Sequence, residues 1–112
     1  ENTELRQAVT RLHNITKNAE EGPVSADLFR EDAEKALWDA YQKVEGKVYS
    51  LYAAHDYAAA MPLLDTLTQP VNHYLDDVMV MDKDEKVRNN RLAMLKTVLA
   101  LFDSWGDFSK LV

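Results

Sequence analysis

Apolar side chains recur along this chain at intervals of three and four residues, which is the spacing of one face of an α-helix. The first stripe consists of Leu5, Val9, Leu12 and either Ile15 or Ala19. It predicts a helix from about Thr3 to Asn18. Gly22 and Pro23 follow, and they combine a C-cap glycine with a residue that cannot continue a helix. We therefore expect the first helix to have ended by this point.

The second stripe is the longest in the chain. It consists of Phe29, Ala33, Ala36, Leu37, Ala40, Tyr41, Val44, Val48, Leu51 and Tyr52. Ser25 and Asp27 precede it, and either side chain can accept hydrogen bonds from the free N–H groups that begin a helix. We expect a helix that opens after Ser25 or Asp27 and runs to about Tyr52.

Two shorter helices follow, and prolines mark both. The first is expected over about Tyr57–Leu67, with Asp56 as its cap. Pro62 lies inside it and removes a backbone donor, so we expect a kink or a break there. Pro70 stops and restarts the chain, because proline is well tolerated at the first position of a helix. A short helix over about Val71–Val80 is expected next.

A final helix is expected over about Asp84–Ser104, closing at Gly106. Asp82 with Glu85 three residues later matches an aspartate variant of a capping box. Connections are short, no repeat of fixed period occurs, and heptads are not sustained. The pattern predicts an all-α fold, a single-domain bundle of about five helices that spans residues 1–112.

The net charge of −6 argues at first against a nucleic-acid partner, but the charges are unevenly distributed. Residues 1–19 carry three basic and two acidic side chains, a balance of +1. Residues 20–82 carry four basic and thirteen acidic ones, a balance of −9, and residues 83–112 carry six and four, a balance of +2. The basic excess lies at the two ends, which could share one positive face if they pack together.

Other features of the sequence limit the classes of protein to which it can belong. The chain has no cysteine, so it has neither disulfides nor thiolate metal sites. No apolar run approaches the roughly 20 residues of a membrane span, and no signal peptide is recognisable. The absence of an initiator methionine suggests a fragment of a longer chain. We expect a cytoplasmic location and no membrane partner.

Catalysis finds little support in the sequence. There is no GxSxG motif, the three histidines are far apart, and three scattered glycines cannot form a phosphate-binding loop. Asp82–Lys83–Asp84 lacks the glycine and the bidentate glutamate of a calcium loop. We expect no catalytic residue, no metal and no cofactor in this fragment.

Arg88–Arg91 places two arginines and two asparagines together near the start of the last helix. Such planar polar groups are suited to hydrogen bonds with phosphates or base edges. Arg88, Asn89 and the later Lys96 point outward by periodicity, which makes them candidate RNA contacts. Arg91 falls on or beside the buried stripe, so we expect it to pair with Asp76 or Asp77 and to organise the fold.

Arg11, Asn14 and Lys17 form a second candidate RNA-binding cluster, since their spacing makes a polar edge on the first helix. The alternative is a solvated face with cations placed favourably near a helix C-terminus. The aromatic side chains could stack on bases if exposed, although their spacing favours a core or a groove lining. They are Trp38, Tyr41, Tyr49, Tyr52, Tyr57, Tyr74, Phe102 and Trp105.

Several motifs resemble the C-terminal region of the bacterial glycyl-tRNA synthetase beta subunit. They are Arg11–Lys17, Leu28–Phe29, Glu34–Leu37, Asp56–Tyr57, Pro70–Val71, Asp77–Met81, Arg88–Leu95 and Asp107–Leu111. The chain departs from the family pattern at Thr16, Pro62 and His73–Leu75. The resemblance implies an all-helical anticodon-binding domain of the DALR type.

By this resemblance the parent is an ATP-dependent glycine–tRNA ligase of alpha and beta subunits, with adenylation on the alpha subunit. The fragment would hold no ATP site. It would bind the anticodon stem and loop of a glycine-specific tRNA, not DNA, and orient it for aminoacylation carried out elsewhere. The alternative is a helical module whose acidic middle docks another subunit or domain. That alternative predicts an exposed apolar patch within residues 20–82.

Overall fold

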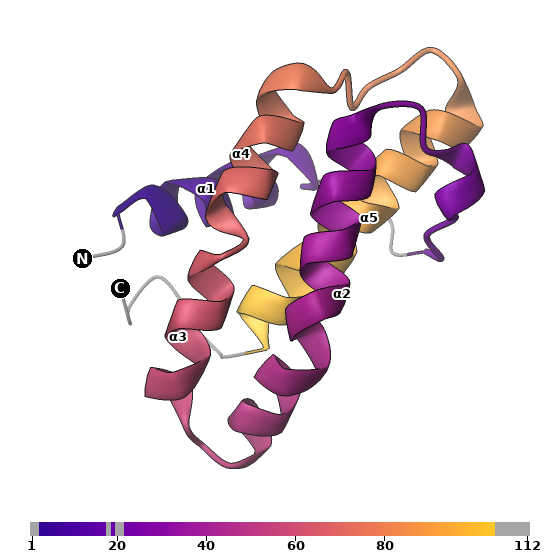
Figure 1. Cartoon of the computed structure of the whole chain (residues 1–112). Coiled ribbons are helices and arrows are strands. Elements are labelled where there is room, and N and C mark those ends of the chain that lie inside the picture. The colour runs from indigo at the N-terminus through magenta and orange to yellow at the C-terminus, as the bar shows by residue number, and fades with distance from the viewer. Residues whose placement is uncertain (1–2, 18, 20–21, 105–112) are drawn as a thin grey trace.

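The computed structural model describes residues 3–17, 19 and 22–104, so the expected closing residues Gly106 and Asp107–Leu111 lie outside the described part. Within that part the chain forms five α-helices and one short 3-10 helix, with no strand (Figure 1). The predicted all-α fold is confirmed. Several helix boundaries differ from the predicted ones, and each difference has a local cause.

Helix α1 spans Thr3–Ile15 and buries Leu5, Ala8, Val9 and Leu12. It stops short of the predicted end at Asn18. The hydroxyl of the buried Thr16 donates a hydrogen bond of 2.6 Å to the carbonyl of Leu12, at the last turn. Gly22 comes after this end, so the prediction that Gly22 caps the helix is wrong.

The predicted start of the long helix is also wrong. Ser25 makes no capping hydrogen bond and precedes only the 3-10 helix η1, Ala26–Leu28. Helix α2 spans Asp32–Ala53 and is capped by Glu31, which forms a capping box with Glu34. The buried Glu34 carboxylate accepts from the backbone N–H groups of residues 30 and 31, at 2.9 and 3.0 Å, and this fixes the start of the helix.

Helix α3 spans Tyr57–Asp65, and Asp56 caps it as predicted by accepting from the N–H of Ala59 at 3.2 Å. The helix continues through Pro62, so the chain does not break there. Helix α4 spans Thr68–Asp77, beginning earlier than predicted. Pro70 lies in its first turn, where backbone N–H groups have no helical partner to lose.

The chain leaves α4 in an extended conformation. Val78 and Val80 are buried whereas Met79 and Met81 are 69% and 62% exposed, which is the alternation of a strand. Helix α5 spans Glu85–Asp103. Its cap is Asp84, which accepts from the N–H groups of residues 86 and 87, and not Asp82 as predicted.

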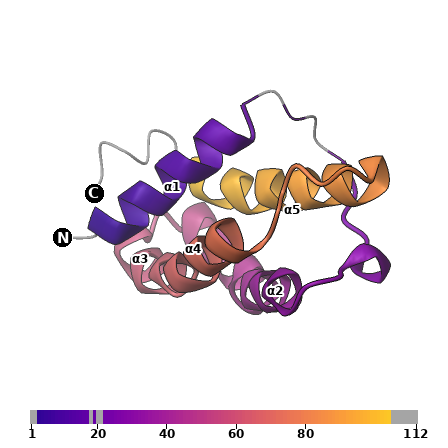
Figure 2. The same ribbon diagram turned by 90° about the horizontal axis from the view of Figure 1, so that it is seen from above.

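The helices form two layers. α2 packs against α3, α4 and α5, while α1 packs against α4 and α5. Seen from above, α1 and α5 lie on one side and α2, α3 and α4 on the other (Figure 2). The connection from α4 to α5 passes over the N-terminal end of α2 (Figure 1), where Arg30 pairs with Asp84 at 3.1 Å.

Candidate nucleic-acid interface

A buried ion pair fixes the start of α5 against α2. Arg91, which is 2% exposed, donates through Nη2 to Glu34 Oε1 at 3.0 Å and through Nη1 to the carbonyl of Met79 at 2.6 Å. Asp82 lies 3.6 Å from the same Nη1. Burial alone would lower the pKa of Arg91, but the hydrogen bond and charge of Glu34 raise it above its ordinary value. Arg91 therefore joins α5 to α2 and to the segment that follows α4.

The prediction that Arg91 pairs with Asp76 or Asp77 is wrong, because both acids lie on the exposed side of α4. Asp76 pairs instead with Arg11 of α1 at 2.8 Å. A second nitrogen of the Arg11 guanidinium donates to the side chain of Asn72 at 3.0 Å. Arg11 thus ties α1 to α4 and uses two of its five guanidinium N–H groups to do so.

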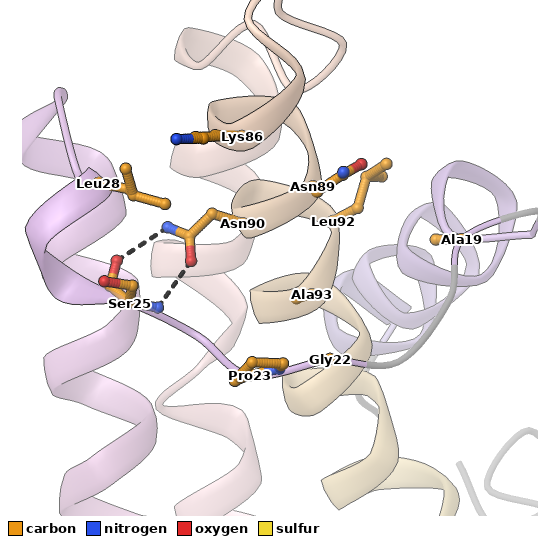
Figure 3. Close-up of a pocket in the computed structure, with 10 residues that line it drawn as sticks. All are labelled: Ala19, Gly22, Pro23, Ser25, Leu28, Lys86, Asn89, Asn90, Leu92 and Ala93. Carbon is orange, nitrogen blue, oxygen red and sulfur yellow. Dashed lines mark hydrogen bonds between the residues drawn. The ribbon is translucent and has the colours of Figure 1, made fainter.

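Asn90 turns inward and binds the segment that precedes η1. Its side-chain oxygen accepts from the N–H of Ser25 at 2.7 Å, and its side-chain nitrogen donates to the carbonyl of Ser25 at 3.0 Å (Figure 3). The residue is 5% exposed. The Asn90–Ser25 bridge therefore holds residues 22–25 against α5.

The exposed side of α5 is hollowed next to this bridge. A cavity of about 660 Å³ is lined from α5 by Lys86, Asn89, Asn90, Leu92 and Ala93, and from the preceding segments by Ala19, Gly22, Pro23, Ser25 and Leu28. Gly22 and Pro23 cross α5 beside Ala93 (Figure 3). Lys86 and Asn89 extend from α5 at the opposite end of this cavity.

Two further hollows continue along α5. Gly22 also lines a cavity of about 430 Å³ together with Tyr41, Tyr49, Lys96, Thr97 and Ala100. Lys96 and Ala100 in turn border a third, of about 270 Å³, near the end of the helix. We call these three adjoining hollows the α5 groove. Its α5 residues recur every three or four positions, and alanine at positions 93 and 100 leaves room above the helix.

The α5 groove unites two of the predicted contact residues, Asn89 and Lys96, and adds Lys86. Sequence reasoning missed Lys86, although its spacing of three from Asn89 and ten from Lys96 places it on the same stripe. Lys86 and Lys96 form no ion pair with any acid that the structure describes. Their charges are therefore available to an anionic ligand.

The other predicted contact residues lie elsewhere. Arg11 and Asn14 line a separate hollow with Ile15 and Leu75, between α1 and α4. Lys17 is exposed just beyond α1. Arg88 is partly buried and donates to the carbonyl of Asp82 at 3.2 Å. The described hollows thus place Asn89 and Lys96 on one surface and Arg11 and Asn14 on another, while Lys17 and Arg88 line neither.

Two acids of the turn before α5, Asp82 and Asp84, have hydrogen-bond donors or cations beside them. The Asp84 carboxylate accepts from two helical N–H groups and from Arg30, which together hold its pKa below the ordinary value. Asp82 accepts from the N–H of Asp84 at 2.8 Å and faces Arg91. The negative charges of this turn therefore oppose an anion at Lys86 less than the sequence suggests.

The described residues contain no candidate metal cluster and no candidate membrane-spanning helix. No group of three or more histidine, aspartate or glutamate side chains there could hold a metal ion. No helix of the same part is both long and apolar enough to cross a membrane.

Comparison with known proteins shows to which family of domains this sequence is similar. The profile of the DALR anticodon binding domain matches residues 5–105. The chain is 43% identical over 107 residues to the glycine–tRNA ligase beta subunit of Citrifermentans bemidjiense and 47% over 112 residues to that of Geotalea uraniireducens. Each match covers 96% of this chain and 16% of the relative. The chain therefore spans about a sixth of these relatives, and the matches agree with the resemblance seen in the motifs.

Proposed function

The chain belongs to the family of DALR anticodon binding domains, and on that premise we propose that it binds the anticodon arm of a tRNA along the α5 groove. One observation carries this proposal: two lysines that pair with no acid in the described part of the chain, and an exposed asparagine, border the adjoining hollows of the α5 groove. Proteins position RNA through cations on phosphates and recognise bases of single-stranded loops through polar groups.

In this proposal Lys86 and Lys96 contact phosphates at two points along the RNA. They are ten residues apart on one helix, which corresponds to about 15 Å along its axis. Asn89 lies between them, and its amide can donate to and accept from the edge of an unstacked base. Arg88, Asn14 and Lys17 would supply flanking contacts, and Arg11 would do so only with the part of its guanidinium that Asp76 and Asn72 leave free.

The role in a larger protein is proposed from the relatives. Their name, glycine–tRNA ligase beta subunit, leads us to propose a glycine-specific tRNA as the ligand and an alpha subunit and further beta-subunit domains as partners. Ligation of glycine, its use of ATP and a cytoplasmic location belong to the same proposal. This domain would position the tRNA for a reaction carried out elsewhere.

The test is salt-dependent binding of this chain to glycine-specific and other tRNAs. We expect Lys86→Glu with Lys96→Glu to weaken binding at least about tenfold and to reduce the slope of log K against log salt by roughly 1 to 2. The matched control is Lys43→Glu with Lys47→Glu. It makes the same charge change on two exposed residues of α2 outside the groove and is expected to have a much smaller effect.

Two outcomes would contradict the proposal. Equal losses in both double variants would mean that total charge, not the α5 groove, governs affinity. An unaltered chain that binds no tRNA with salt dependence would remove the RNA-binding function itself.

A second candidate function is docking of another domain or subunit, and one observation favours it. Met79 and Met81 are large apolar side chains exposed within residues 20–82, where this alternative predicts an apolar patch. Met79→Ser with Met81→Ser should then disturb assembly with the rest of a beta subunit and leave tRNA affinity unchanged. The same tRNA titration therefore separates the two functions.

A further inference from the structure

The middle hollow of the α5 groove combines aromatic rings with a cation. Tyr41 and Tyr49 of α2 line it from one side, and Lys96 and Thr97 of α5 from the other. Its volume of about 430 Å³ lies within the range of small-ligand sites. The residues that line this hollow differ in chemistry from those of the neighbouring hollows. They indicate which kind of ligand it can bind.

The ring of Tyr49 is partly exposed to solvent and packs against a neighbouring ring. It is 37% exposed. Its ring meets that of Tyr52 edge to face, with centroids 6.1 Å apart and planes at 88°. Tyr52 is buried and donates its hydroxyl to the carbonyl of Leu101 at 2.8 Å, so the ring that supports Tyr49 is fixed to α5. A ring held in this way loses little conformational freedom when another planar group stacks on it.

Tyr41 contributes a hydrogen-bond donor that nothing described in the protein uses. The residue is 7% exposed and stacks on Trp38, with ring centroids 5.3 Å apart and planes at 18°. Tyr41 lines the hollow, and its hydroxyl has no hydrogen-bond partner among the described residues. Burial, with smaller contributions from Tyr49 and Glu45, raises the pKa of Tyr41 to about 12.

We propose that this hollow holds one unstacked nucleotide of a single-stranded RNA loop, with its base against the Tyr49 ring and its phosphate on the Lys96 ammonium. The inference rests on the proposed function, because it assigns a subsite within the same groove. Two donors, Lys96 and Tyr41, suit a ligand rich in acceptor oxygens, and the exposed ring suits a flat partner. A base within a duplex is already stacked on both faces and cannot meet the second requirement.

The first test compares Tyr49→Ala with Tyr49→Phe in this chain. The probe is an anticodon-arm hairpin with its loop free, or with the loop annealed to a complementary strand. We expect Tyr49→Ala to weaken binding of the free loop about tenfold, the effect typical of a lost base–aromatic stack. Tyr49→Phe keeps the ring and should remain within about twofold of the unaltered chain. Binding of the annealed form should not change in either variant.

A second measurement uses the unaltered chain, so it stands even if Tyr49→Ala fails to fold. A hairpin carrying 5-iodouridine in its loop should photocrosslink to Tyr49, and mass spectrometry would locate the adduct. Guanosine monophosphate at millimolar concentration should not prevent the crosslink, because a free nucleotide lacks the contacts at Lys86 and Asn89. Met79→Ala, which removes an exposed apolar side chain outside the groove, should crosslink normally.

The possible results separate a failure of the proposed nucleotide subsite from a failure of the proposed RNA-binding function. RNA binding that survives Tyr49→Ala unchanged, with adducts only outside the hollow, overturns the subsite and leaves the RNA-binding proposal standing. Displacement by micromolar free nucleotide also overturns it, in favour of a mononucleotide site. Absence of any RNA binding by the unaltered chain overturns both.

Discussion

Residues of the same type have different roles at the start of α5. Asn90 and Arg91 are buried and hold the fold together, while Asn89 is exposed in the groove and Arg88 is only partly covered. Since a helix turns by about 100° per residue, neighbours in sequence face different surroundings. The residue type indicates what each group can bind, and the apolar stripe around it decides whether that partner is protein or ligand.

The Glu34–Arg91 pair gives the first prediction at the residue scale. Arg91→Met should destabilise the fold by about 3–5 kcal/mol, because it leaves the fully buried Glu34 carboxylate without its cation. Urea unfolding followed by circular dichroism measures this loss. Arg88→Met is the matched control and should cost less than about 1.5 kcal/mol, since it removes one hydrogen bond at a partly buried position.

Adding Glu34→Gln to Arg91→Met removes the stranded charge but keeps an oxygen for the N–H groups of Arg30 and Glu31. The double variant should therefore recover at least about 1 kcal/mol relative to Arg91→Met. Strict additivity of the two changes would indicate that the pair does not interact as the geometry requires.

At the scale of elements, the short segment before η1 is held by α5 and not by helix formation of its own. Asn90→Ala removes both hydrogen bonds of the Asn90–Ser25 bridge and should cost about 1–3 kcal/mol. Hydrogen exchange of the Ser25 amide should accelerate in the same variant. Asn89→Ala, one residue away and exposed, should change stability by less than about 0.5 kcal/mol.

An Asn90→Ala variant with native stability and a slowly exchanging Ser25 amide would show that other contacts hold the segment. The measurement is specific, because only the backbone of Ser25 takes part in the bridge.

The sequence predicted the helices better than their ends. Apolar spacing predicted the two long helices and the first one, while Asp56 and Pro70 marked the two short helices between them. Asp56 was correctly identified as a cap because no other capping side chain competes there. The start of α2 was missed because Ser25 and Asp27 are better caps by residue type than Glu31. Glu34 makes the helix begin after Glu31 instead, because the Glu34 carboxylate is buried and paired with Arg91, a residue 57 positions away. Tertiary partners of this kind are not visible in local sequence.

At the scale of the whole molecule, the candidate site was predicted in part. Asn89 and Lys96 could be found because outward periodicity is a local property. The groove could not, since it needs Gly22 and the tyrosines of α2 brought to α5 by the fold. Nor could the tie between Arg11 and Asp76, which joins helices 65 positions apart in the chain.

Buried tyrosines make the whole fold sensitive to alkali. Burial raises the pKa of Tyr41 to about 12 and those of Tyr52 and Tyr74 further. Unfolded tyrosine loses its proton near pH 10, so between pH 10 and 12 the unfolded state binds fewer protons and stability falls as pH rises. For Tyr41 alone the expected loss is about 1.4 kcal/mol by pH 11, one pH unit above the pKa of unfolded tyrosine. Urea midpoints at pH 8, 10 and 11 measure it.

Tyr41→Phe provides the control for this pH dependence. The substitution removes the ionisable hydroxyl and, because that hydroxyl bonds no described residue, should leave stability at pH 8 nearly unchanged. The fall above pH 10 should become shallower. An identical pH profile in Tyr41→Phe would mean that Tyr41 ionises as freely in the folded state as in the unfolded one.

The bridge from α5 to residue 25 uses only main-chain atoms on one side. Every amino acid except proline, which has no N–H, carries the same pair of groups. The side chain at position 25, on the rim of the groove, can therefore be replaced without losing the two hydrogen bonds that hold this segment to α5. Variants at that single position offer a way to change what the groove admits, such as a bulkier or a charged rim, while the helices beneath it stay in place.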